Sequence, residues 1–140
     1  MASQRRRRAR QPVVLVVEDE PTVRSLAESI LEDIGYVTLS AGDAREALVL
    51  LQADDPVDLL FTDINMPDGP DGVELARSAV ELRPGLRVLY TTGGARTDGM
   101  TALFIEGSGF LQKPYTRERL IETLRTLLPT DQRPPLTRFY

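Results

Sequence analysis

The stretch "VVLVVEDEPTV", residues 13–23, contains the two features from which the fold of this chain can be predicted. Its first five residues form an unbroken apolar run rich in β-branched side chains, which is typical of a strand buried on both faces. The acidic turn that follows ends at Pro21, and proline is favoured in the first turn of a helix because its missing N–H costs nothing there. The stretch therefore predicts a strand, an acidic turn and a helix.

The same alternation continues along the chain. Strand patterns recur at residues 36–40, 57–62, 86–91 and 109–112. Helices are predicted from Pro21 to a left-handed cap at Gly35, after a cap at Asp43, over 72–83 and over 116–128, whereas residues 98–107 are weakly helical at best. The apolar residues expected to face the core are, helix by helix, Val23, Leu26, Ala27, Ile30, Leu31 and Ile34; Ala44, Ala47, Leu48 and Leu51; Val73, Ala76, Ala79 and Val80; and Leu120, Ile121, Leu124, Leu127 and Leu128.

Five strand–helix units with short connections require a parallel sheet that is covered on both faces, because each crossover returns the chain to the sheet with the same hand. We therefore predict an α/β fold with a doubly wound, five-stranded parallel sheet. Residues 12–129 are expected to form this one domain, preceded by a disordered basic arm at 1–11 and followed by a tail at 130–140.

Composition limits the chemistry that such a domain can perform. The 140 residues include no Cys and no His, so thiolate chemistry, imidazole bases and histidine phosphodonors are excluded, and Lys113 is the only lysine. Five of the 17 basic residues lie in the arm, which leaves 12 against 21 acidic residues from Pro12 onward, without a basic stripe for nucleic acid. No apolar run approaches the roughly 20 residues that span a bilayer, so a cytoplasmic protein without a membrane span is expected.

Polar residues follow the predicted strands where the strands end. In a parallel sheet these carboxyl ends meet at one edge, where ligands bind. The residues are Glu18, Asp19 and Glu20 after the first strand, Asp63 and Asn65 after the third, Thr91 and Thr92 after the fourth and Lys113 after the fifth. Converging carboxylates suit a hard divalent cation, most plausibly Mg²⁺. The alternative, that each acid only caps a helix, explains Glu20 or Asp43 better than it explains three acids at one edge.

With a cation beside it, Asp63 can act as a nucleophile towards phosphorus. Phosphoryl transfer depends mainly on positioning and charge neutralisation, which the cation, Lys113 and a hydroxyl such as Thr91 would provide. A lysine is a compact point charge, whereas an arginine is a flat fork, and this difference explains why the site uses the one lysine of an arginine-rich chain. The Lys113–Pro114 bond can be cis or trans from sequence alone.

Four motifs resemble those of the receiver domains of two-component response regulators over about residues 12–128. They are "VVEDE" (16–20), "LLFTDINMPDGPDG" (59–72), "VLYTTGG" (88–94) and "FLQKPY" (110–115). The resemblance implies a flavodoxin-like strand order 2-1-3-4-5, phosphorylation at Asp63 and Mg²⁺ bound directly by Asp19 and Asp63. It further implies that Glu18 acts nearby or through water, that Asn65 supplies its backbone carbonyl, that Thr91 rather than Thr92 is the switch hydroxyl and that Phe110 is the switch aromatic.

The resemblance also implies partners. A histidine kinase or a histidine phosphotransfer protein would supply the phosphoryl group, and a downstream protein would respond. No direct DNA binding is expected. Phosphorylation-dependent formation of a homodimer is a further possibility. The chain would catalyse its own phosphorylation and dephosphorylation as a single-domain regulator, a phosphate sink or a relay intermediate. Two alternatives are a pseudo-receiver that binds partners without phosphorylation and a metal-dependent phosphatase, although the latter usually carries Asp-x-Asp after its first strand.

Overall fold

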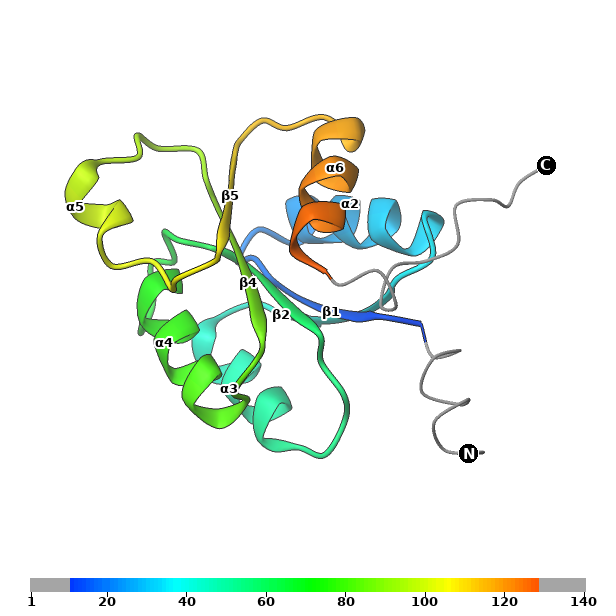
Figure 1. Ribbon diagram of the computed structural model, residues 1–140, viewed down its shortest axis with the longest axis horizontal. Helices are drawn as coiled ribbons and strands as arrows, with labels where there is room; N and C mark the ends of the chain where they lie inside the picture. Colours follow the sequence, from blue (N-terminus) through cyan, green and yellow to red (C-terminus); the bar gives the residue numbers. More distant parts are fainter. Residues whose placement is uncertain (1–10, 129–140) are drawn as a thin grey trace.

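All five strands form one parallel sheet in the order β2-β1-β3-β4-β5 in the computed structural model, which describes residues 11–128 (Figure 1). The strands are β1 (Val13–Val17), β2 (Val37–Ala41), β3 (Leu59–Asp63), β4 (Arg87–Thr92) and β5 (Gly109–Gln112). The helices are α2 (Pro21–Asp33), α3 (Ala44–Gln52), α4 (Gly72–Leu82), α5 (Asp98–Thr101) and α6 (Arg117–Leu127). The predicted fold class and strand order are confirmed.

Helices cover both faces of the sheet, so the core has two halves. On one face, buried residues of α2 and α6 pack against Val14, Phe61 and Leu111 of the strands. On the other face, α3 and α4 pack against Leu15 and Tyr90, and α5 lies beyond them towards the β5 edge (Figure 1). Since β1, β3 and most of β4 are buried on both faces, the unbroken apolar runs in the sequence have their structural reason.

The helices begin where the sequence places capping residues. The Asp43 side chain accepts a hydrogen bond from the Glu46 amide at the start of α3, as predicted. Asp71 and Glu74 form a reciprocal capping box at the start of α4, with both bonds at 2.9 Å. After α2 the chain turns at Gly35 with φ of 105°, the left-handed conformation that the sequence predicts there.

The prediction that Leu26 faces the core is wrong, because its side chain is 63% exposed. Leu26 lies about 100° around the helix from Ala27, at which the buried stripe of α2 is centred. The weak helix predicted over 98–107 is a single turn, Asp98–Thr101. The Lys113–Pro114 bond is cis.

The predictions for residues 1–10 and for the tail lie outside the described residues, whereas Gln11 is described and donates a hydrogen bond to the Gly35 carbonyl at 3.1 Å. Within residues 11–128, no helix combines the length and the apolar character that a membrane crossing needs.

Candidate functional site

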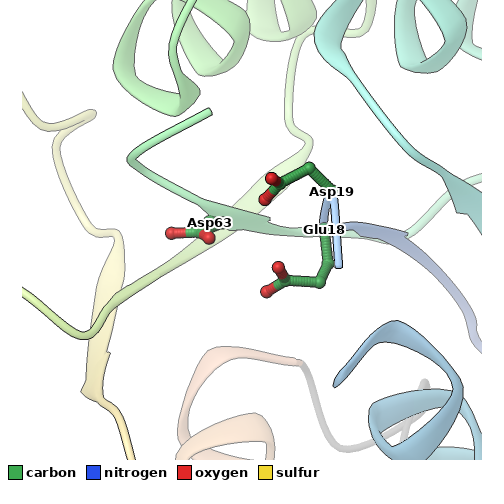
Figure 2. Close-up of side chains that lie close together, drawn as sticks. All are labelled: Glu18, Asp19 and Asp63. Carbon is green, nitrogen blue, oxygen red and sulfur yellow. The ribbon is translucent and has the colours of Figure 1, made fainter. Parts of the chain in front are cut away.

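Three carboxylates meet at the carboxyl edge of the sheet. Val17 pairs with Thr62 across β1 and β3, so the residues that follow them, Glu18 and Asp63, emerge side by side. Glu18, Asp19 and Asp63 each offer one oxygen, and these oxygens lie within 4.8 Å of one another (Figure 2). Glu18 and Asp63 are only 5% and 6% exposed, whereas Asp19 is exposed. The structure thus brings together the three acids that the strand pattern singled out.

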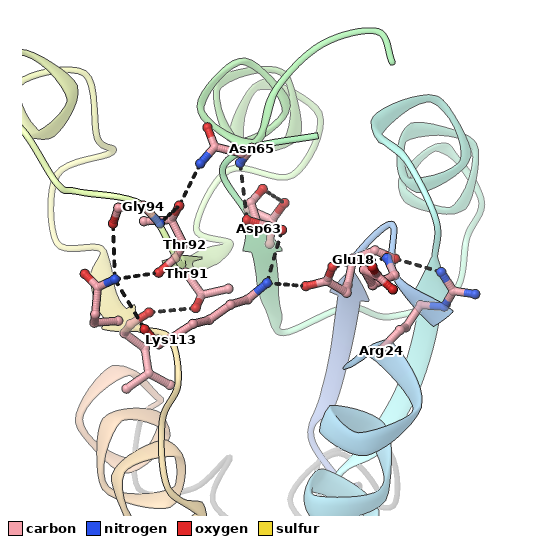
Figure 3. Close-up of polar contacts among 12 residues, drawn as sticks. Glu18, Arg24, Asp63, Asn65, Thr91, Thr92, Gly94 and Lys113 are labelled. Atoms are coloured by element: carbon pink, nitrogen blue, oxygen red, sulfur yellow. Dashed lines mark hydrogen bonds and ion pairs between the residues drawn. The ribbon is translucent and has the colours of Figure 1, made fainter. Parts of the chain in front are cut away.

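Lys113 reaches this cluster from the end of β5, on the other side of β4. Its Nζ donates to Glu18 Oε1 at 2.7 Å and to Asp63 Oδ2 at 3.2 Å (Figure 3). Its backbone N–H donates to the Thr92 carbonyl at 2.9 Å, which extends the sheet pairing to the lysine. One ammonium therefore joins acids from two strands, a contact that suits a point charge better than a planar fork.

Burial and charge oppose each other in this site. Burial raises the pKa of the Glu18 carboxyl above its ordinary value, and the hydrogen bond from Lys113 offsets only part of this effect. Burial alone would lower the pKa of Lys113, but the hydrogen bond that its ammonium donates to Glu18 and the charges of Asp63 and Glu18 outweigh burial, so that the pKa is raised. Lys113 is therefore a firmly protonated cation at neutral pH, beside a carboxyl that is costly to ionise.

Asn65 connects the acids to the end of β4. Its backbone N–H donates to Asp63 Oδ1 at 3.2 Å, which places the Asn65 backbone at the acidic cluster. Its side-chain Nδ2 donates to the Thr92 hydroxyl at 2.8 Å (Figure 3). The Gly94 backbone N–H donates to the same hydroxyl at 3.1 Å.

The two adjacent threonines of β4 face opposite sides of the sheet. The buried Thr91 hydroxyl donates to the Leu111 carbonyl at 2.6 Å, and its side chain lies with Phe61 and Tyr115 on the α2 and α6 face. Thr92 is the threonine whose hydroxyl bonds to Asn65, and it also lies on the face where Phe110 packs. The structure therefore does not bring the Thr91 hydroxyl towards Asn65, whereas it does bring the Thr92 hydroxyl there.

Three further residues shape the site although sequence reasoning did not single them out. Arg24 in α2 donates from Nη1 to the Glu18 carbonyl at 2.7 Å, holding the acidic turn (Figure 3). Gly72 leaves no room for a side chain, because an added Cβ would overlap the Asp63 carbonyl oxygen and lie 2.8 Å from Ile64 Cα. Gln112 donates to the Thr92 and Gly94 carbonyls at 3.0 and 3.1 Å. The only sequence signal was that Arg24 and Gly72 lie in the first turns of the helices that follow the acidic strand ends.

The donor set fits a hard divalent cation. All three convergent groups are carboxylates, and their oxygens are near enough to share one ion. Carboxylates this close repel one another, and the single ammonium of Lys113 neutralises only part of their charge. A divalent cation would supply the missing positive charge.

Comparison with known proteins agrees with the family that the sequence motifs resemble. The family model described as "Response regulator receiver domain" matches residues 14–125. The chemotaxis protein CheY1 of Helicobacter pylori is 33% identical over 121 residues, covering 84% of this chain and 98% of CheY1. The probable transcriptional regulator ycf27 of Cyanophora paradoxa is 30% identical over 124 residues, covering 89% of this chain, but the chain spans only 51% of that protein.

A solved structure adds a chemical detail. The response regulator protein TrrA from Thermotoga maritima, solved in complex with Mg²⁺ and BeF, aligns with a TM-score of 0.73 and 27% identity, covering 84% of this chain and all of that one. The sheet order, the acidic edge and the family match together define a signalling domain of the two-component class. The chain belongs to the response regulator receiver family.

Proposed function

We propose that this protein is a phosphoacceptor of a two-component system, which takes a phosphoryl group on Asp63 in a Mg²⁺-dependent reaction. The observation that carries this proposal is the placement of Lys113 Nζ between Glu18 and Asp63, within a cluster of three acids at one sheet edge. A structural ion pair would need one acid, whereas a phosphoacceptor needs an excess of negative charge that a cation then relieves.

In the proposed reaction an Asp63 carboxylate oxygen attacks the phosphorus of the donor. A P–O bond forms, the bond from phosphorus to the donor's leaving atom breaks, and the leaving group takes the electron pair. Bound Mg²⁺, held by Asp19, Asp63, the Asn65 carbonyl and Glu18 directly or through water, would neutralise charge on the transferring oxygens. Lys113 would give up its contact with Asp63 Oδ2 for one with a phosphoryl oxygen, because that tip already lies at 3.2 Å from the nucleophilic carboxylate.

The hydroxyl that answers phosphorylation is proposed to be that of Thr91. The pairing of β3 with β4 sets Asp63 opposite Thr91, and paired residues of parallel strands point to the same face of the sheet. In the unphosphorylated protein the Thr91 hydroxyl donates to the Leu111 carbonyl at 2.6 Å. A phosphoryl group adds about −1.5 to −2 charges and three acceptor oxygens, which favours turning the Thr91 hydroxyl from that carbonyl towards Asp63.

The proposed phosphodonor is a histidine kinase or a histidine phosphotransfer protein, and the proposed readout is the binding of a downstream protein. The chain has no histidine, so the phosphohistidine must come from a partner. Relay and phosphate-sink roles fit the same chemistry. Phosphorylation-dependent dimerisation and a cytoplasmic location stay predictions.

The test is intact-mass measurement after incubation with Mg²⁺ and a small phosphodonor such as acetyl phosphate. We expect a gain of one phosphoryl group in the natural protein, no gain in Asp63→Asn and no gain with excess chelator. Asp68→Asn is the matched control, because Asp68 is an exposed acid in the same loop. Labelling that persists in Asp63→Asn would refute the assignment.

A pseudo-receiver is the second candidate, and the same experiment separates it. Such a protein would stay unlabelled with Mg²⁺ present although it folds normally. The complete set of Glu18, Asp19, Asp63 and Lys113, with the lysine already in contact with two of the acids, argues against it.

A further inference from the structure

The acidic turn after β1 is held at its backbone as well as at its side chains. The Glu18 backbone N–H donates to the Ala41 carbonyl at 3.1 Å, and the Glu20 backbone N–H donates to Glu18 Oε2 at 3.1 Å. Arg24, in the first turn of α2, donates from Nη1 to the Glu18 carbonyl at 2.7 Å (Figure 3). That carbonyl belongs to the planar peptide group between Glu18 and Asp19, so Arg24 fixes the orientation of the peptide at which Asp19 begins.

Asp19 is the acid of the cluster with the least support of its own. Within residues 11–128 its side chain makes no hydrogen bond or ion pair, and the residue is exposed. Glu18 and Asp63, in contrast, are buried, and each contacts Lys113. An oxygen of Asp19 nevertheless lies within 4.8 Å of an oxygen of each of the other two acids (Figure 2). The placement of the Asp19 carboxylate therefore depends mainly on the course of the backbone that leads into it.

The Arg24 side chain is committed to this backbone contact. Among the described residues it forms no ion pair, and its one side-chain hydrogen bond is the one to the Glu18 carbonyl. Residue 42, directly after β2, is a glycine, and a Cβ there would lie 3.3 Å from Arg24 Nη1, closer than most such contacts. The guanidinium thus occupies space that a side chain at Gly42 would crowd, and a charged donor makes the stronger hydrogen bond to a carbonyl.

We propose that Arg24 is a positioning residue for the cation site, which orients the Glu18–Asp19 peptide so that the Asp19 carboxylate faces Asp63. Arg24 acts through the backbone and does not itself touch the cation. This inference rests on the proposed function. Residues that orient metal ligands typically contribute about 10- to 100-fold to metal affinity, and a ligand without a hydrogen bond of its own depends most on such support.

The test is a titration with MgCl₂ at constant ionic strength, followed by the NMR amide signals of Asp19 and Glu20. In Arg24→Gln, whose side chain is too short to reach the carbonyl, the half-saturating Mg²⁺ concentration should rise about tenfold, the lower end of that range, since the other bonds of the turn remain. Loss of a positive charge near a cation site should by itself strengthen Mg²⁺ binding, so the direction of the change separates orientation from charge. Arg24→Lys keeps a charged donor on a shorter stem and should give a smaller rise.

Arg45→Gln is the matched control. Arg45 is an exposed arginine in the first turn of α3, at the same edge of the sheet, and makes no hydrogen bond or ion pair within residues 11–128. Its replacement should leave the half-saturating Mg²⁺ concentration unchanged or slightly lower.

Three results would overturn the inference. They are an unchanged or lower half-saturating concentration in Arg24→Gln, an equal rise in Arg45→Gln, and a lower melting temperature of metal-free Arg24→Gln without any change in Mg²⁺ binding, which would indicate a merely structural role. If the amide signals of the natural protein do not respond to MgCl₂ at all, the proposed function fails, and the inference fails with it for a distinguishable reason.

Discussion

Helices α4 and α5 lie on the same face of the sheet and follow adjacent strands, yet they are attached in different ways. The α4 helix has 11 residues, five of them buried, and begins with a reciprocal capping box. The α5 helix has four residues, none of them buried, and a single Thr97 cap. The position of α4 is therefore fixed by its own cap and its own buried side chains. The position of α5 depends on contacts with side chains of the neighbouring strands.

The two helices also differ in how they are connected to Asp63 in the candidate site. The Gly72 backbone N–H at the start of α4 donates to the Ile64 carbonyl at 2.8 Å, directly beside Asp63, the proposed phosphoacceptor. The segment of residues 93–108, which contains α5, is connected to Asp63 less directly, through Gly94, Thr92 and Asn65. A nucleophile needs a fixed position, whereas a responding segment needs two conformations that are close in free energy. Under the proposed function, the fold meets both requirements with two helices that lie on one face of the sheet and follow adjacent strands.

Gly72→Ala should disrupt the packing of α4 against the end of β3. The added methyl would overlap the Asp63 carbonyl oxygen and crowd Ile64 Cα, both of them backbone atoms that cannot rotate away. We expect a loss of more than about 3 kcal/mol in the free energy of unfolding, measured by denaturant titration. A loss below about 1 kcal/mol would mean that the contact between α4 and β3 is loose.

Replacing each threonine of β4 by valine should distinguish their roles. Thr91→Val should raise the half-saturating concentration of beryllofluoride, a mimic of an aspartyl phosphate titrated in excess Mg²⁺, about 10- to 100-fold, the range for a lost hydrogen bond to a charged group. It should also lower the unfolding free energy by about 1–3 kcal/mol, because the buried Leu111 carbonyl loses its donor. Thr92→Val should leave the beryllofluoride concentration nearly unchanged, and the reverse pattern would assign the switch role to Thr92.

Hydrogen exchange should show the contrast directly. Backbone amides of residues 92–107 should exchange fastest among the described residues in the unphosphorylated protein, whereas those of α4 should exchange only near global unfolding. Phosphorylation should slow exchange in 92–107 and leave α4 unchanged. Strong protection of 92–107 before phosphorylation, or no change after it, would place the responding surface elsewhere.

Glu18→Gln should stabilise the metal-free protein at pH 7 by a few degrees in melting temperature. Burial raises the pKa of Glu18, so the contribution of this group to stability is complete where it is protonated, below its ordinary value of 4.5, and is lost as the pH rises through the raised folded-state pKa. The gain from the amide should therefore shrink as the pH is lowered towards 4.5. Melting curves across this range test the sign, with the exposed acid of α4, Glu81→Gln, as control.

Gly99→Ala should give the smallest effect and the opposite sign to Gly72→Ala. An added Cβ at Gly99 meets no atom within 4 Å, and alanine favours helix by about 0.8–1.0 kcal/mol over glycine. We expect slower amide exchange around α5, with the melting temperature of the whole domain nearly unchanged. A clear rise in melting temperature would mean that α5 is part of the cooperative core.

Much of the fold could be predicted because its determinants are local. Uninterrupted apolar runs such as 13–17 occur where strands are buried on both faces, and the single hand of the crossovers leaves few topologies. The acidic cluster followed from the same rule, since carboxyl ends of parallel strands share one edge whatever the details of packing. The exposure of Leu26 was not predicted. Which apolar residues at the margin of an amphipathic helix are buried depends on how the helix is rotated about its axis against the sheet.

The amino-acid sequence by itself determined the sheet, the edge at which the acids meet and the single lysine available to reach them. Only the tertiary structure decided which of Thr91 and Thr92 lies beside Asn65, because neighbouring residues of a strand point to opposite faces and a shift of one position exchanges them. It alone also placed Arg96 on Phe110, a contact between residues 14 positions apart that exists only where the loop folds back over β5. Patterns along a chain specify which residues share a face, whereas the contacts between loops depend on the packing of the whole domain.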